Sequence, residues 1–256
     1  MKVLQALGAW VEAVFYAAGR YPHLLIEILR RIKRPPWFPQ LILEQAEHVG
    51  VQSLPVVLLT ALFTGMVLAL QSYIGFHRFG AENMVATVVS LSMLRELGPV
   101  LVGLMVAGRV GASFAAELGT MRVSEQIDAL WTLSTDPLRY LVMPRFISAI
   151  IMLPLLVALA DAIGIFGGYV ISVFMLGQNP HSYLENSTLY VELRDMYSGL
   201  FKAGCFGAII GLVGCAEGFY CQGGAQGVGQ ATTRAVVFSA MSILVSDYLL
   251  TAWLFQ

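Results

Sequence analysis

Charged side chains are scarce in this chain of 256 residues. Asp, Glu, Lys and Arg together make up 12% of it, about half of the ~25% found in soluble domains, whereas hydrophobic residues make up 57%. A water-soluble domain of this size has too much surface to cover with so few charges. The composition therefore excludes a disordered chain and predicts an integral membrane protein.

Excess positive charge, cysteine and histidine are also in short supply. The formal net charge is −1, which argues against a nucleic-acid partner because such a partner requires a basic face. Cys205, Cys215 and Cys221 lack the spacing of a metal site, and we interpret them as small buried hydrophobic residues rather than a disulfide framework. The four histidines are scattered, so we expect no catalytic, metal or cofactor site in the chain.

Five apolar stretches are long enough to cross a membrane as helices. About 20 mostly apolar residues are needed, because ~30 Å of hydrocarbon is crossed at ~1.5 Å per residue. The stretch over 83–117 is longer than that, and Gly98-Pro99 offers a bend, so we expect one bent span that extends into the cytoplasm. The predicted fold is an all-α integral membrane protein with spans at about 54–76, 83–117, 146–177, 200–220 and 235–255.

Lys and Arg are distributed unevenly between the predicted loops. Basic residues concentrate on the cytoplasmic side of membrane proteins. With the N-terminus inside, the outer loops hold only Arg78 and Arg194, and three further cations lie within spans. The sequence therefore predicts a cytoplasmic N-terminus and an outer C-terminus. The cytoplasmic cations are Lys2, Arg20, Arg30, Arg31, Lys33, Arg34, Arg122, Arg139, Arg145 and Arg234.

Residues 1–48 form a predicted N-terminal region that precedes one membrane domain, 49–256. Apolar residues recur in it at helical spacing and a basic cluster over 30–34 follows, which favours an amphipathic helix lying at the membrane interface. A cleavable signal peptide is the alternative, because Lys2 precedes an apolar run, but Glu12 and the basic cluster argue against it. The apolar positions are Leu4, Leu7, Val11, Val14 and Phe15.

Four charged residues fall inside the predicted spans and at a similar depth. Arg95 and Glu96 lie in the outer half of the second span, Lys202 at the outer end of the fourth, and Asp247 just past the middle of the fifth. Each charge in hydrocarbon costs at least ~2.5–3.5 kcal/mol unless it has a partner or a water-filled cavity. Two interpretations stay open: buried ion pairs that lock the helices together, or the polar lining of a cavity open to the outside. Buried pairs add little net stability, which favours the cavity.

The loop over 117–145 is the longest internal hydrophilic segment and has a structured pattern. Ser124 is a candidate N-cap with Glu125 in the first helical turn, and Asp136-Pro137 is a second helix-start signal. We expect a short amphipathic helix that either docks a cytoplasmic motor domain or lies on the bilayer. Its apolar face consists of Ile127, Leu130 and Trp131.

Several of these segments resemble one known family. The resemblance runs in register from the first span to the C-terminus, and the block over 94–130 is highly specific. The segments that carry it are LRELGPV (94–100), AGRVGAS (107–113), AELGTMRVSEQIDAL (116–130), DPLR (136–139), Pro144-Arg145, ATTRAVV (231–237) and Asp247. Together they resemble the MlaE family of ABC-transporter permeases.

The resemblance implies a function and a set of partners. Members of this family form a homodimer in the inner membrane of Gram-negative bacteria, bound to two cytoplasmic ATPase subunits (MlaF-like) that hold ATP and Mg. A STAS-domain protein (MlaB-like) supports the ATPases, and a hexamer of MCE-domain subunits (MlaD-like) lies on the periplasmic side. Phospholipid passes between a cavity at the dimer axis and the hexamer, which maintains outer-membrane lipid asymmetry. The permease itself is then neither an enzyme nor a cofactor-binding subunit.

The resemblance also implies residue roles. The positions that match the family's lipid cavity are Arg95, Glu96, Lys202 and Asp247, and those expected to couple to the ATPase are Glu117, Arg122, Glu125, Ile127, Leu130 and Trp131. The alternative is a membrane protein without a motor. A secondary transporter is disfavoured because no convincing internal repeat is present. A lipid-modifying enzyme is disfavoured because no reactive motif is present.

Overall fold

The computed structural model describes residues 19–31 and 38–255. Within these ranges every regular element is helical and no strand occurs, so the all-α prediction is confirmed. The apolar positions proposed for an interfacial helix, from Leu4 to Phe15, lie outside the described residues.

Five helical rods in the described ranges are long and apolar enough to cross a membrane, which confirms the five predicted spans and a multi-pass membrane protein. Each rod extends beyond the predicted apolar stretch at one or both ends. The helices continue past the hydrocarbon-length core because capping and packing end them, not hydropathy. The rods run over Pro39–His77, Glu82–Val123, Leu138–Met175, Leu193–Phe219 and Gly224–Phe255.

The first rod packs closely along the third. A Cβ atom built on Gly65 lies 1.8 Å from the carbonyl oxygen of Gly164, so the two backbones touch where both residues lack side chains. The first rod contains α2 (Pro39–Val49), η1 (Val51–Ser53) and α3 (Leu54–His77), and the third contains η5 (Leu138–Val142), α8 (Met143–Val170) and η6 (Ile171–Met175).

The second rod is continuous through Gly98-Pro99 and contains two π-helical turns. Pro99 has no N–H, so the α-helical hydrogen bond to the carbonyl of Arg95 cannot form, and the wider turn η3 lies at this position. The rod consists of η2 (Glu82–Met84), α4 (Val85–Ser92), η3 (Met93–Leu97), α5 (Gly98–Val106), η4 (Ala107–Gly111) and α6 (Ala112–Val123).

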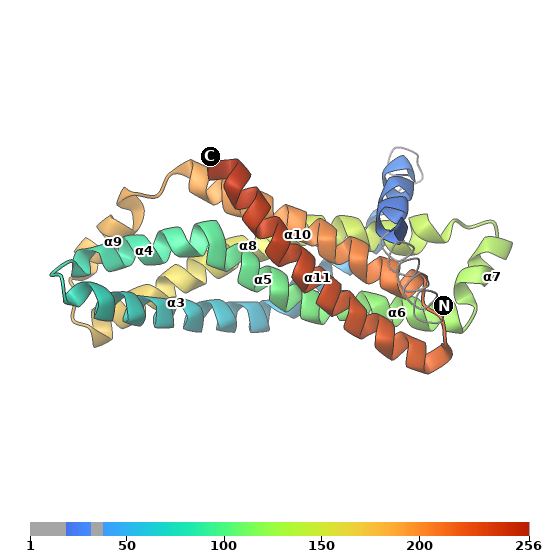
Figure 1. Cartoon of the computed structure of the whole chain (residues 1–256), viewed down its shortest axis with the longest axis horizontal. Helices are drawn as coiled ribbons and strands as arrows, with labels where there is room; N and C mark the ends of the chain where they lie inside the picture. The colour runs from blue at the N-terminus through green and yellow to red at the C-terminus, as the bar shows by residue number, and fades with distance from the viewer. Residues whose placement is uncertain (1–18, 32–37, 256) are drawn as a thin grey trace, which may run out of the picture.

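The fourth rod, α10 (Leu193–Phe219), forms the centre of the bundle and packs against α8, α11 and α6. The fifth, α11 (Gly224–Phe255), crosses obliquely over α10 and α5 (Figure 1). Most of α11 faces outwards, and its exposed apolar residues suit contact with lipid tails or another membrane protein. They include Met241, Leu244, Val245, Tyr248 and Leu249.

Two short helices mark opposite ends of the bundle (Figure 1): α7 (Gln126–Thr132) and α9 (Pro180–Leu189). The expected Ser124 cap on α7 does not form. The Ser124 hydroxyl instead donates to the carbonyl of Thr120 in the last turn of α6 (2.8 Å), and Glu125 adopts a left-handed conformation (φ 59°) that turns the chain into α7. The Asp136 prediction is confirmed, because its Oδ1 accepts from the Leu138 N–H at the start of η5 (3.1 Å).

Candidate functional site

The Lys202 side chain lies at the centre of a polar cluster formed by three helical rods. Its side chain is completely buried, and its Nζ donates to Glu96 Oε2 (2.7 Å), to Thr251 Oγ1 (2.7 Å) and to the carbonyl oxygen of Arg95 (2.9 Å). An ammonium has three N–H donors, so all three are used.

The contact with the Arg95 carbonyl follows from the sequence of the second rod. In an α-helix this oxygen accepts from the N–H of the residue four positions on, which is Pro99. Since proline has no N–H, the carbonyl is left without its helical donor, and Lys202 Nζ supplies one from α10. The Leu-Arg-Glu-Leu-Gly-Pro segment thus creates the acceptor that Lys202 fills.

Two carboxylates share this one ammonium. Asp247 Oδ1 lies 3.2 Å from Lys202 Nζ, and Glu96 is the closer partner. The Thr251 hydroxyl lies 3.1 Å from Glu96 Oε1 and 2.8 Å from the backbone carbonyl oxygen of Asp247, one helical turn earlier, and its single proton serves one of these at a time. The side chains of Glu96 and Asp247 are 38% and 20% exposed, so the accessible edge of the cluster is acidic while the cation lies behind it.

Arg95 does not direct its side chain at the same group. Its Nε donates to Asp195 Oδ1 (2.8 Å), and its guanidinium lies 4.9 Å from the centre of the Phe255 ring. Asp195 is buried, and its second oxygen accepts from the backbone N–H of Glu192 in the capping box that starts α10. Of the four predicted residues, three bring their side chains together, and Arg95 contributes its carbonyl.

Asp195 and Thr251 belong to the cluster but were not predicted. Thr251 follows Asp247 by four residues and Asp195 precedes Lys202 by seven, so each lies on the same helix face as a predicted residue. Helical spacing from the predicted charges therefore identifies both.

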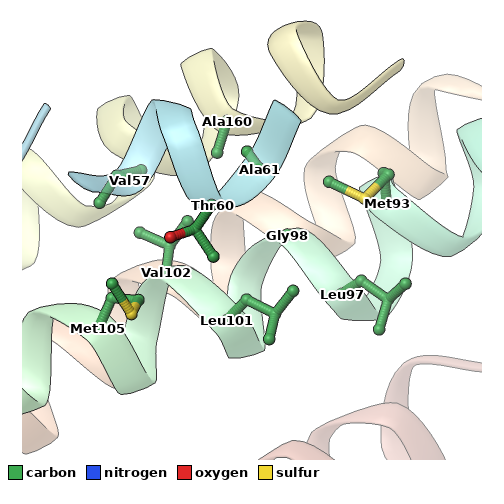
Figure 2. A pocket seen from close by; sticks show the side chains of 10 residues that line it. All are labelled: Val57, Thr60, Ala61, Met93, Leu97, Gly98, Leu101, Val102, Met105 and Ala160. Atoms are coloured by element: carbon green, nitrogen blue, oxygen red, sulfur yellow. The ribbon is translucent and has the colours of Figure 1, made fainter. Parts of the chain in front are cut away.

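An open apolar groove of about 470 Å³ runs along α3. One residue of the second rod lines it, Leu97, which directly follows Glu96 in the chain. Below it, α3 packs on η3 and α5 around an enclosed cavity of about 10 Å³ (Figure 2), too small and too apolar for more than a single water molecule. The groove is lined by Thr60, Phe63, Thr64, Val67, Leu68, Gln71 and Leu97.

The arrangement offers a charged, partly exposed edge beside an apolar surface. Such a site has the chemistry to bind an amphipathic molecule. No cluster of His, Cys, Asp and Glu suited to a metal ion occurs in the part of the chain that the structure describes.

Comparison with known proteins identifies the family of the chain. The family profile described as Permease MlaE matches residues 42–253, which include most of all five rods. The chain belongs to the MlaE permease family. A probable ABC transporter permease of Rickettsia conorii is 58% identical over 254 residues, covering 99% of this chain and 98% of that protein.

Two more distant relatives carry other names. The intermembrane phospholipid transport system permease protein MlaE of Haemophilus influenzae is 39% identical over 258 residues, covering 98% of this chain and 97% of that protein. The chloroplastic protein TRIGALACTOSYLDIACYLGLYCEROL 1 of Arabidopsis thaliana is 39% identical over 214 residues, covering 84% of this chain and 61% of that protein.

In this MlaE-family permease, the six residues expected to couple to an ATPase separate into two groups. Glu117 is partly exposed (37%), and its carboxylate accepts from Arg145 (2.7 Å) and Ser113 (2.9 Å) and so joins α6 to α8. The others lie on or near α7. Ile127 is buried, Leu130 is half-buried, Trp131 is 51% exposed, Glu125 is exposed, and Arg122 pairs with Asp128 (2.6 Å).

Proposed function

We propose that this chain is the permease subunit of an ABC transporter that moves phospholipid, and that the polar cluster with its adjoining groove is the lipid cavity. The observation that carries this proposal is the convergence of Glu96, Lys202 and Asp247, from three rods, next to an apolar groove along α3. A phospholipid needs both surfaces: a polar edge for its headgroup and an apolar wall for its acyl chains.

The placement of basic residues supports a cytoplasmic N-terminus and a C-terminus on the opposite side. The MlaE family supports the inner membrane of a Gram-negative bacterium, whose outer side is the periplasm. Two arginines, Arg78 and Arg194, lie in the segments at the α9 end of the bundle. The segments at the α7 end carry Arg20, Arg30, Arg31, Arg122, Arg139, Arg145 and Arg234. The α7 end is then cytoplasmic, by the positive-inside rule.

The α7 end then docks the motor. Trp131 and the neighbouring Leu133, which is 73% exposed, form an apolar contact on the outside of a helix that Arg122 ties to α6. Exposed tryptophan with a surrounding polar rim is typical of interaction surfaces. The partner is an ATPase that binds ATP and Mg, and a STAS-domain protein supports the ATPase. ATP hydrolysis takes place in the ATPase and not in this permease subunit.

The complex contains a second copy of this chain and a periplasmic MCE-domain hexamer that exchanges phospholipid with the cavity, which maintains outer-membrane lipid asymmetry. The membrane domain extends over 49–256 and the N-terminal interfacial region over 1–48; α2 belongs to the second half of that region and packs against α8.

The test is lipid transfer by the complete complex in vesicles. Glu96→Gln and Asp247→Asn remove one charge each with little change in shape, and we expect both to lower ATP-driven phospholipid transfer about tenfold while assembly is retained. Glu185→Gln, on the exposed surface of α9, is the matched control with normal transfer. Normal transfer by both cluster variants contradicts the cavity, and transfer without ATP favours a motor-independent carrier.

A further inference from the structure

The helix over 19–31 stands crosswise to the rods in the α7 half of the bundle (Figure 1); we call it the strap. Leu24 and Ile28 are almost completely buried on its inner face, so it is packed against protein along its length. Its two ends make polar contacts with different parts of the molecule, and neither contact is needed for the lipid cavity.

The first anchor joins the strap to α10 and α11. Tyr21 donates its hydroxyl proton to Glu217 Oε1 (2.6 Å), and Glu217 Oε2 accepts from Arg234 Nε (2.7 Å). The Tyr21 ring also meets Phe238 of α11 edge-on, with ring centres 6.4 Å apart. Burial, followed by the hydrogen bond to Glu217, raises the pKa of Tyr21 well above its ordinary value, so the hydroxyl stays a donor.

The second anchor joins the strap to the segment between α7 and α8. Arg31 Nε donates to Asp136 Oδ2 (2.5 Å), and Glu27 in the strap also binds the Arg31 guanidinium. Asp136 uses its other oxygen to accept the Leu138 N–H that starts η5. One carboxylate thus fixes the strap to the point where the chain from α7 enters the third rod.

We infer that the strap is a second mechanical connection between the motor-docking helix and the lipid cavity, and that Arg31 and Tyr21 are its positioning residues. The covalent connection from α7 leads into α8, which carries no member of the polar cluster. The strap leads instead from Asp136 to Glu217 and Arg234, in the α7 halves of the two helices that hold Lys202 and Asp247. This inference rests on the proposed function.

Two anchors in series give a specific expectation for variants. Arg31→Gln removes the charge at one end and Tyr21→Phe removes one oxygen at the other. We expect each to lower the number of phospholipids transferred per ATP hydrolysed by about threefold to tenfold in the full complex, with ATP hydrolysis itself retained. Because a connection broken at one end transmits nothing, the double variant should be no worse than the more affected single variant.

The controls separate transmission from stability. Arg30→Gln makes the same change one residue earlier, at an exposed side chain (74%) whose ion pair is with Glu27 (3.5 Å), and should leave the ratio unchanged. Arg31→Lys retains a cation and should keep most of the wild-type ratio of phospholipid transferred to ATP hydrolysed. If Arg31→Gln does not assemble, Tyr21→Phe alone decides.

Three results would overturn the inference: a normal transfer-to-hydrolysis ratio in Tyr21→Phe, losses that multiply in the double variant, or parallel loss of both activities. Absence of ATP-driven transfer in the wild-type complex refutes the proposed function instead, so the two failures are distinguishable.

Discussion

Replacement of Lys202 by methionine has the largest effect that the structure predicts. Methionine keeps the volume and flexibility of the side chain but removes the ammonium. Glu96 and Asp247 then face each other with no cation between them, and the carbonyl of Arg95 loses the donor that compensates for Pro99.

The cost follows from these lost contacts. Removing one partner of a buried ion pair costs about 3–5 kcal/mol, because the remaining charge stays buried and uncompensated. A further contribution of about 1–3 kcal/mol from the orphaned carbonyl is offset where the partly exposed Glu96 carboxylate regains water. At about 2–4 °C per kcal/mol for a chain of this size, we expect the unfolding midpoint in detergent to fall by about 6–20 °C.

A compensating variant makes the reasoning refutable. Lys202→Met combined with Glu96→Gln and Asp247→Asn has no uncompensated charge, so most of the lost stability should return. Phospholipid transfer should not return, because the acidic edge is gone. The ion-pair account is wrong if the single variant keeps the wild-type midpoint, or if the triple variant is less stable than the single one.

Two further predictions concern packing and docking. Gly65→Ala should lower the unfolding midpoint by an amount equivalent to about 1–3 kcal/mol, because the new Cβ meets the Gly164 carbonyl. Gly75→Ala, with open space around the new Cβ, should leave the midpoint unchanged. Equal midpoints for the two variants would contradict the contact between Gly65 and Gly164. Trp131→Glu should weaken copurification of the ATPase without changing the unfolding midpoint, since the Trp131 side chain is half-exposed. Thr132→Glu, at an exposed position of the same helix, is the control. Unchanged copurification of the ATPase with Trp131→Glu would place the docking surface elsewhere.

Hydropathy alone located all five rods, because long apolar segments in a chain with so few charges are stable as membrane-spanning helices. It underestimated their ends, and it could not show that the second rod absorbs Pro99 in a π-helical turn. The donor that satisfies the Arg95 carbonyl, Lys202, lies on a distant part of the chain, so the sequence around Pro99 does not reveal it.

Depth within the spans grouped the charges of the polar cluster correctly for Glu96, Lys202 and Asp247. It could not determine the direction of the Arg95 side chain, because its partner Asp195 lies at the start of a helix and reads in sequence as a capping residue. The Ser124 cap failed for a related reason: a serine between two helices can end the first or begin the second, and here it belongs to α6.

The strap contacts had no sequence signal. Arg31 belongs to a basic cluster that favours contact with anionic headgroups, yet its guanidinium binds Glu27 and Asp136. Pairing between residues 105 positions apart is fixed only by how the rods pack.

Photo-crosslinking of phospholipid tests the central claim most directly. A phospholipid with a photoreactive group near the carboxyl end of one acyl chain should label the α3 residues of the groove, Thr60 to Gln71, in the complete complex, and Glu96→Gln with Asp247→Asn should reduce that labelling. Labelling of the exposed face of α8, at Ile151, Leu155 and Leu159, should be unaffected by these substitutions, since these residues do not line the groove. Equal labelling of both faces, with no response to the substitutions, would contradict a lipid cavity at the polar cluster.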